Sequence, residues 1–274
     1  MPARGRRAVT AGAAVLLALA LAGAAAPLLA PDPYATDLRA RLALPRPGHA
    51  LGQDSLGRDV LARVMHGARI SFAVGATVVA LSLLLGVTVG AAAGYLGGWF
   101  DEAVARVIDV LLAFPGLLLA IALAAVLGPS LGNVVLALSL LGWTGYARLA
   151  RAEVAALRQR EFVRAAEALG AGPSRIVARH LLPFAAPVLL VQATFGMAGA
   201  IVAESSLSFL GLGAPSPLAS WGAMIDEGRP FLLVAPQVVV WPGIALATTV
   251  LALQLVGDGL RDLLDVRSRV PDRP

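Results

Sequence analysis

Side chains that could do chemistry are few and scattered in this chain of 274 residues. There is no cysteine, which excludes disulfides and thiolate chemistry. There is also no lysine, because all 22 basic residues are arginine, so a phosphate-binding loop of the G-x-x-x-x-G-K-[ST] type is excluded. His49, His66 and His180 lie far apart and form no metal-binding motif. We therefore expect no catalytic residue, no metal site and no cofactor bound by this chain.

Three residues in apolar stretches are candidates for a pathway or a gate. Glu204 is the one acidic residue near the end of its stretch. Burying an ionisable group in a membrane is costly, so its presence there suggests a function. The alternative is that Glu204 lies near the outer interface, where it is easily solvated. Gln192 is a weaker polar candidate. Pro115, in AFPGLLLAI, should kink its helix, either to line a pathway or as a tolerated bend.

The composition is that of a membrane protein. Hydrophobic residues make up 58% of the chain, charged residues only 14%, and the mean hydropathy is +0.79. The basic pI near 10.8 comes from arginines at the ends of apolar segments, which favours a membrane protein over a nucleic-acid binder. These features predict an all-α integral membrane protein.

Apolar runs and turn residues divide the chain into six predicted transmembrane helices. The turn GPSLGN, residues 128–133, separates two of them, since residues 110–147 would otherwise be too long for one crossing. The first run follows MPARGRR and exceeds the core of a signal peptide, so we favour a retained helix, with cleavage after AGAAAP as the alternative. The predicted helices span about 8–30, 70–98, 103–127, 131–147, 181–204 and 231–257.

Arginine counts predict the orientation. With both ends inside, the cytoplasmic segments hold 14 arginines and the outer segments hold seven. The exception is the outer segment 31–69, which has six arginines, partly offset by four aspartates. We expect three regions: a first helix with an extracytoplasmic segment (1–69), a core of five transmembrane helices (70–258) and a cytoplasmic tail (259–274).

Gly86, Gly90 and Gly94 form two successive G-x-x-x-G spacings. Four-residue spacing places them on one helix face and lets another backbone approach closely. The partner is either a helix of the same chain or another subunit.

The charged segment 148–182 interrupts the apolar runs. Helix formers predict that residues 148–169 are helical, and Gly170 with Gly172, in EFVRAAEALGAGPSRIVARHLLP, should end this helix before a second, short one begins at Pro173. An apolar face of the first helix is predicted at Phe162, Ala165, Ala166 and Leu169. Such a face suits either the lipid surface or a groove on a partner, and its small residues favour the partner.

The segment resembles the cytoplasmic E-A-A-x-x-x-G loop by which permease subunits of ATP-binding-cassette importers dock on their ATPases. Arg164, Ala165 and Ala166 stand at the E-A-A positions, Gly170 at the glycine, and Leu182 with Pro183 at the closing L-P. Two positions depart from the motif: Arg164 replaces glutamate, and His180 replaces an aliphatic residue. The predicted ATPase-coupling residues are Phe162, Arg164, Ala165, Ala166, Leu169, Gly170, Arg175, His180, Leu182 and Pro183.

The resemblance extends over nearly the whole chain and is to the "C"-type permease subunits of the dipeptide, oligopeptide and nickel importers. It rests on residues 51–75, 91–121, 203–213, 221–229 and 255–267, with Val266 in place of the usual proline. It implies a type I importer permease (MetI-like) fold in a bacterial inner membrane. It also implies a second permease subunit, two ATPase subunits that bind ATP and Mg²⁺, and an extracytoplasmic solute-binding protein.

Substrate identity stays open between dipeptides, oligopeptides, glutathione-like compounds and nickel complexes. An ion-coupled secondary transporter is the rival from another class. It predicts midplane ion sites and broken helices in matching halves, for which only Glu204 and Pro115 are candidates. An enzyme within the membrane has no plausible catalytic set.

Overall fold

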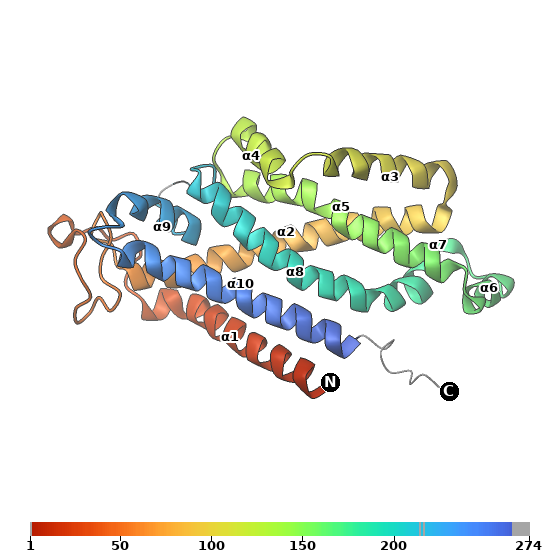
Figure 1. Ribbon diagram of the computed structural model, residues 1–274, viewed down its shortest axis with the longest axis horizontal. Coiled ribbons are helices and arrows are strands. Elements are labelled where there is room, and N and C mark those ends of the chain that lie inside the picture. The colour runs from red at the N-terminus through yellow and green to blue at the C-terminus, as the bar shows by residue number, and fades with distance from the viewer. Residues whose placement is uncertain (1, 214, 216, 265–274) are drawn as a thin grey trace.

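The computed structural model describes residues 2–213, 215 and 217–264, and this part of the chain is helical without named strands (Figure 1). The α-helices are α1 (Pro2–Leu29), α2 (Val60–Leu96), α3 (Gly98–Leu112), α4 (Gly116–Leu127), α5 (Leu131–Arg158), α6 (Glu161–Ala168), α7 (Pro173–Ile176), α8 (Leu182–Phe209), α9 (Trp221–Gly228) and α10 (Gln237–Leu264). Short 3₁₀ turns cover Leu38–Ala40 and Arg229–Phe231, and a π-helical turn covers Val177–Leu181. Most of the predicted tail, including Val266, lies outside the described residues.

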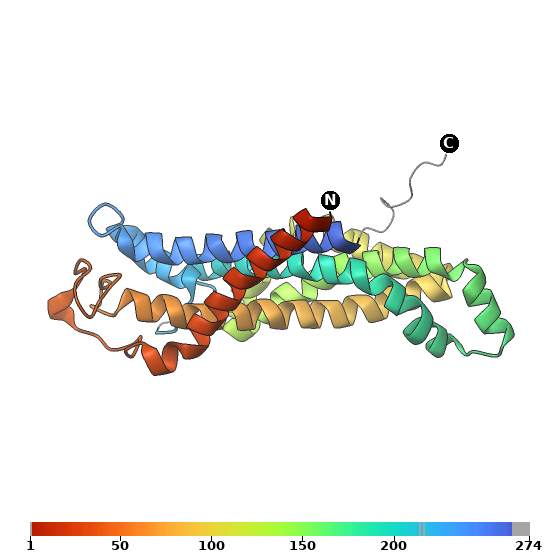
Figure 2. The ribbon, with the colours of Figure 1, turned by 90° about the horizontal axis from the view of Figure 1, so that it is seen from below.

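The long helices lie side by side in an elongated bundle with two different ends (Figures 1 and 2). Helix α2 packs along α5, α8 lies between α2 and α10, and α1 packs on α10. One end carries α6 and α7, and the described chain ends point toward it; we call it the α6 end. The opposite end carries residues 30–59 and α9; we call it the α9 end.

Helix α2 begins ten residues before the predicted start. Asp59 caps it, because its Oδ1 accepts a hydrogen bond of 2.7 Å from the backbone N–H of Ala62. Residues 60–69, which the sequence placed in the extracytoplasmic segment, are therefore helical. Their charged residues suggested solvated chain, but Arg63 is fully buried and ion-paired.

The predicted helix 103–127 is broken into two at Pro115. Helix α3 ends at Leu112, Pro115 precedes the first residue of α4, and the two axes differ by 83°. Proline lacks an amide hydrogen and disfavours a helical conformation in the residue before it, here Phe114. The result is a broken helix and not the kinked one that the sequence predicted.

In the described chain, four helical segments are long and apolar enough to cross a membrane, or five if the bent α3–α4 pair counts as one span. This criterion does not confirm the predicted count of six. The four are Arg4–Leu29, Val60–Leu96, Pro173–Phe209 and Gln237–Leu264. Helix α5 is not among them; its second half carries Arg148, Arg151 and Glu153.

The segment 148–182 is mostly helical, as predicted for residues 148–169, but the predicted single helix is divided between α5 and α6. Helix α5 continues to Arg158, and residues 173–209 form one helical segment through the π-turn. Only α6 and its flanking turns leave the long helices. The last two membrane helices also end later than predicted, at Phe209 and Leu264.

Candidate functional site

The hairpin formed by α6 and α7 projects from the bundle at the α6 end (Figure 2). Its turn depends on Gly170, whose φ of +80° lies in the left-handed region. The Gly170 N–H donates to the Glu167 carbonyl at 2.9 Å, and the Ala171 N–H donates to the Ala166 carbonyl at 3.0 Å. These bonds end α6 and turn the chain toward α7.

The face of α6 that packs on the bundle is not the predicted apolar face, with which it shares only Ala166. Val163 is fully buried against Ile176 and Leu181, and Ala166 packs on the same cluster. By contrast, the side chains of Phe162 and Leu169 are 38% and 89% exposed. Val163 and Ala166 are three positions apart, a spacing that could have revealed this inward face.

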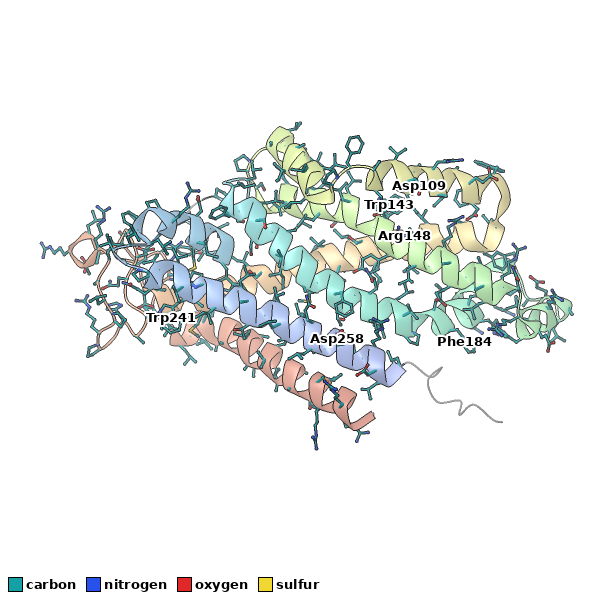
Figure 3. All side chains as sticks on the ribbon, in the orientation of Figure 1. Asp109, Trp143, Arg148, Phe184, Trp241 and Asp258 are labelled. Atoms are coloured by element: carbon teal, nitrogen blue, oxygen red, sulfur yellow. The ribbon has the colours of Figure 1, made fainter. Side chains whose placement is uncertain are left out.

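Phe162, Ala165 and Leu169 thus form an exposed face of α6, which we call the α6 outer face. Phe162 contacts Phe184 of α8, with ring centroids 5.3 Å apart. Figure 3 shows Phe184 near the α6 end of that helix. An exposed apolar face on a protruding helix is suited to contact another molecule.

The remaining predicted coupling residues spread over the hairpin. Arg175 is exposed on α7, and His180 is half-buried in the π-turn. Leu182 packs on the cluster below α6, and Pro183 stands in the first turn of α8, directly after the π-turn. Arg164 points away from the α6 outer face and lines a cavity with Arg158.

Tyr95 connects α6 to the end of α2, a contact that the sequence did not reveal. Its hydroxyl donates to Glu167 Oε1 at 3.3 Å, and the Arg158 guanidinium lies over its ring at 5.0 Å from the centroid. The hairpin is thereby attached both to α2 and to α5.

A cavity of about 310 Å³ lies within the bundle, between α2, α4, α5 and α8. Its wall is mainly apolar, with Ser82, Tyr146 and Gln192 as polar groups. The Tyr146 hydroxyl is buried and has no hydrogen-bond partner among the described residues. Gln192 and Gly116, the neighbour of Pro115, are thus brought together, and we call this the bundle cavity.

Glu204 lies outside the bundle cavity. Its side chain is fully buried, and its Oε1 accepts a hydrogen bond of 2.7 Å from Ser208 Oγ. The expected easy solvation at the outer interface is therefore not observed. Ser205, which also contacts the carboxylate at 3.4 Å, packs closely on Gly222 of α9.

The glycines of the G-x-x-x-G spacings lie against α5 of the same chain. A β-carbon on Gly86, Gly90 or Gly94 would approach a carbonyl oxygen of α5 to 2.5, 2.2 and 2.4 Å, respectively. Such distances are shorter than van der Waals contact, so no side chain fits between the helices. The stripe sets the close approach of α2 and α5.

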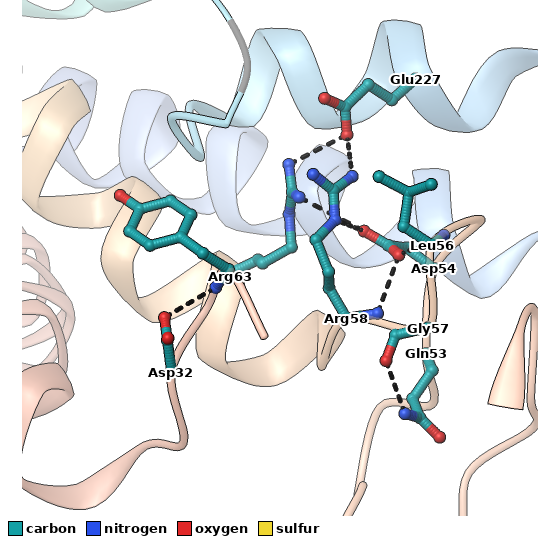
Figure 4. Close-up of polar contacts among 9 residues, drawn as sticks. Asp32, Gln53, Asp54, Leu56, Gly57, Arg58, Arg63 and Glu227 are labelled. Carbon is teal, nitrogen blue, oxygen red and sulfur yellow. Dashed lines mark hydrogen bonds and ion pairs between the residues drawn. The ribbon is translucent and has the colours of Figure 1, made fainter. Parts of the chain in front are cut away.

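Three buried charged residues, Asp54, Arg58 and Arg63, form a cluster with the partly exposed Glu227 at the α9 end (Figure 4). Arg58 Nε lies 2.6 Å from Asp54 Oδ2, and its Nη2 lies 2.5 Å from Glu227 Oε2. Arg63 Nη2 lies 2.9 Å from the same Glu227 oxygen, and its Nη1 lies 3.3 Å from Asp54. Two of the six arginines in segment 31–69 are therefore neutralised by carboxylates, which weakens their apparent conflict with the predicted orientation.

Within the described residues, no group of three or more His, Cys, Asp or Glu side chains could hold a metal ion. The long apolar helices define a polytopic helical membrane protein, with a protruding hairpin at one end and a cavity between its helices.

Comparison with known proteins gives the family. Residues 86–270 match the family model described as binding-protein-dependent transport system inner membrane component, and the chain belongs to this family. The chain is 41% identical to a dipeptide transport system permease protein of Alkalihalophilus pseudofirmus, covering 94% of this chain and 85% of that protein. It is 44% identical to a putative peptide transport system permease protein of Brucella suis, covering 97% and 90%, respectively. A glutathione transport system permease protein of Pectobacterium atrosepticum is 43% identical over 81% of this chain and 73% of that protein.

Proposed function

We propose that this chain is a permease subunit of an ATP-driven peptide importer in a bacterial inner membrane. It would form half of the pathway together with a second permease subunit. Two ATPases would bind ATP and Mg²⁺, and an extracytoplasmic solute-binding protein would deliver the solute. The single observation that carries the proposal is the match to peptide permeases over nearly the whole chain.

The bundle cavity is the candidate pathway wall. Tyr146 and Gln192 offer polar groups there, and an unpaired buried hydroxyl is costly unless a water, a solute or a second state satisfies it. The broken α3–α4 pair places Gly116 at the same cavity. Irregular backbone at membrane depth is tolerated where it lines a cavity or is buried in protein.

The α6 outer face is the candidate contact with an ATPase. Movement of α6 would reach α8 through the continuous helical segment 173–209 and α2 through Tyr95 and Glu167. A contact can shift the permease between states only if it binds them with different affinity. The hairpin is therefore proposed to act as a lever, meaning that it transmits movement of the ATPases to α8 and α2. The α6 end and both chain ends would lie in the cytoplasm.

The lever is tested with Gly170→Val in the assembled transporter. Because φ at Gly170 is +80°, a β-branched side chain should strain the turn by about 1–3 kcal/mol. We expect ATP-dependent peptide uptake into proteoliposomes to fall while the ATPases stay bound or bind less tightly. Gly172→Ala is the control, since nothing lies within 4 Å of its added methyl group and its φ is −72°. Unchanged uptake in Gly170→Val would refute the lever.

The rival function, ion-coupled transport, is tested with the chain alone. Vesicles that contain only this protein should show no solute uptake under an ion gradient. Uptake without the ATPases would overturn the proposed function, whatever the result for Gly170→Val.

A further inference from the structure

A second cavity, of about 610 Å³, lies behind α6 at the ends of α2, α3 and α5. Five charged side chains line it: Asp101, Arg151, Arg158, Arg164 and Glu167. We call it the basic cavity, because its arginines outnumber its carboxylates. The proposed transport function does not use it.

Two of the three arginines have no carboxylate partner in the described part of the chain. Arg151 is paired, since its Nη2 lies 2.6 Å from Asp101 Oδ2 and its Nε also contacts that carboxylate. Glu167 accepts a hydrogen bond from the Tyr95 hydroxyl. Arg158 stacks on the Tyr95 ring, and Arg164 is exposed, so both guanidinium groups can bind an added anion.

We expect the basic cavity to lie near the lipid headgroups. Its lining includes Gly94 and Gly97, at the α6 end of the apolar helix α2. Trp99, two residues further on, is 79% exposed, and exposed tryptophan is typical of the membrane–water interface. An anion here would meet the membrane surface on the side where anionic lipids are recognised by basic residues.

The basic cavity also faces away from the candidate ATPase contact. At roughly 100° per residue, Glu167 lies about 170° and Arg164 about 130° from the centre of the α6 outer face. A partner docked on that outer face alone would therefore leave Glu167 uncovered and would meet Arg164 only at the edge of the contact.

We propose that the basic cavity binds the phosphodiester headgroup of an anionic phospholipid, with phosphatidylglycerol as the probe. Arg158 and Arg164 bind the phosphate oxygens, and the lipid holds α6 against the end of α2. The planar guanidinium fork matches phosphate geometry better than an ammonium group. This site and the α6 outer face lie on different sides of the helix, so either proposal can fail without the other.

The test is native mass spectrometry of the full-length chain in detergent, titrated with phosphatidylglycerol or with phosphatidylcholine. We expect phosphatidylglycerol to bind more tightly than phosphatidylcholine. In Arg158→Gln/Arg164→Gln the affinity for phosphatidylglycerol should fall roughly thirtyfold, because two basic contacts near an anionic surface are lost. The matched control is Arg160→Gln/Arg179→Gln, which removes the same charge from exposed positions outside the cavity and should have little effect.

Several results would overturn the proposal. One is an equal loss of phosphatidylglycerol affinity in both double variants, and another is equal binding of the two lipids by the wild-type chain. A third is a thermal-unfolding experiment in which inorganic phosphate, but not phosphatidylglycerol, raises the melting temperature. Release of the lipid when the ATPases assemble would assign the cavity to that interface instead. If the double variant does not fold, Arg164→Gln alone decides, because Arg164 is exposed and should still lose affinity about fivefold.

Discussion

At the scale of residues, the buried charges at the α9 end are the clearest case of pairing that tertiary structure makes possible. Arg63 is completely buried, and Arg58 is only 2% exposed. An isolated buried guanidinium would be very unfavourable, but Asp54 and Glu227 supply equal opposite charge. The cluster joins the chain before α2 to α9 across more than 160 positions of sequence.

We predict that Glu227→Gln destabilises the protein by about 3 kcal/mol, because both arginines would lose one carboxylate while remaining buried. Thermal unfolding of the purified chain in detergent measures the effect. Asp226→Asn is the control, since Asp226 forms no ion pair with another described residue and the substitution removes the same charge. Equal melting temperatures for the two variants would show that the cluster contributes little.

Substitution of Tyr146 tests whether the bundle cavity has a functional or only a structural role. Tyr146→Phe removes a buried hydroxyl that has no partner in the described chain, so stability should be unchanged or slightly higher. If the hydroxyl contacts the solute or its water, ATP-dependent uptake by the full transporter should fall about fivefold, the value of one hydrogen bond. Normal uptake in this variant would exclude the hydroxyl from the pathway.

At the scale of elements, the close contact of α2 and α5 organises the centre of the bundle. Water does not drive helices together inside a lipid bilayer, so packing of small residues has to do so. Gly86, Gly90 and Gly94 let the α2 backbone approach the carbonyls of α5. The same contact positions Tyr146 at the bundle cavity and Arg151 at the basic cavity.

Gly90→Ala should therefore be destabilising by about 1–3 kcal/mol, the usual cost of overpacking, because its methyl group would lie 2.2 Å from the Ala147 carbonyl oxygen. Gly243→Ala in α10 is the matched control, since nothing lies within 4 Å of the added methyl group. Alanine also favours helix, so the control should be neutral or stabilising. Thermal unfolding and yield in detergent would compare them, and equal stability would contradict the packing argument.

At the scale of the whole molecule, the two ends differ in charge and in structure. The α6 end carries the hairpin and the arginines of α5, while the α9 end carries the cluster of Figure 4. Figure 3 shows Trp241 toward the α9 end and Arg148 and Asp258 nearer the α6 end. The arginine excess predicts that the α6 end is cytoplasmic.

The absence of cysteine makes this orientation directly measurable. We predict that a membrane-impermeant maleimide labels Ala35→Cys from the outer side of the inner membrane and does not label Ala168→Cys there. Both positions are alanines that are exposed in the structure, so accessibility is matched. Labelling of Ala168→Cys from outside would invert the topology and remove the basis of the proposed lever.

The sequence by itself determined the membrane class, the apolar segments, the Gly170 turn and, through resemblance, the family. These depend on local composition, turn chemistry or a continuous motif, all of which are readable along the chain. Pro115 shows the limit of prediction from local sequence, because a kink was expected and a break with an angle of 83° between the helix axes is found. The size of such a bend depends on the residues that pack around it.

Only the tertiary structure decided which charged residues are buried and which residues of α6 pack on the bundle. Arg63 is helical and buried because Glu227 approaches from a distant segment, and no local pattern carries that information. Val163 faces inward because Ile176 and Leu181 fold back on it. The physical reason is the same in both cases: burial and charge compensation are set by neighbours in space, whereas periodicity along one helix describes only the helix itself.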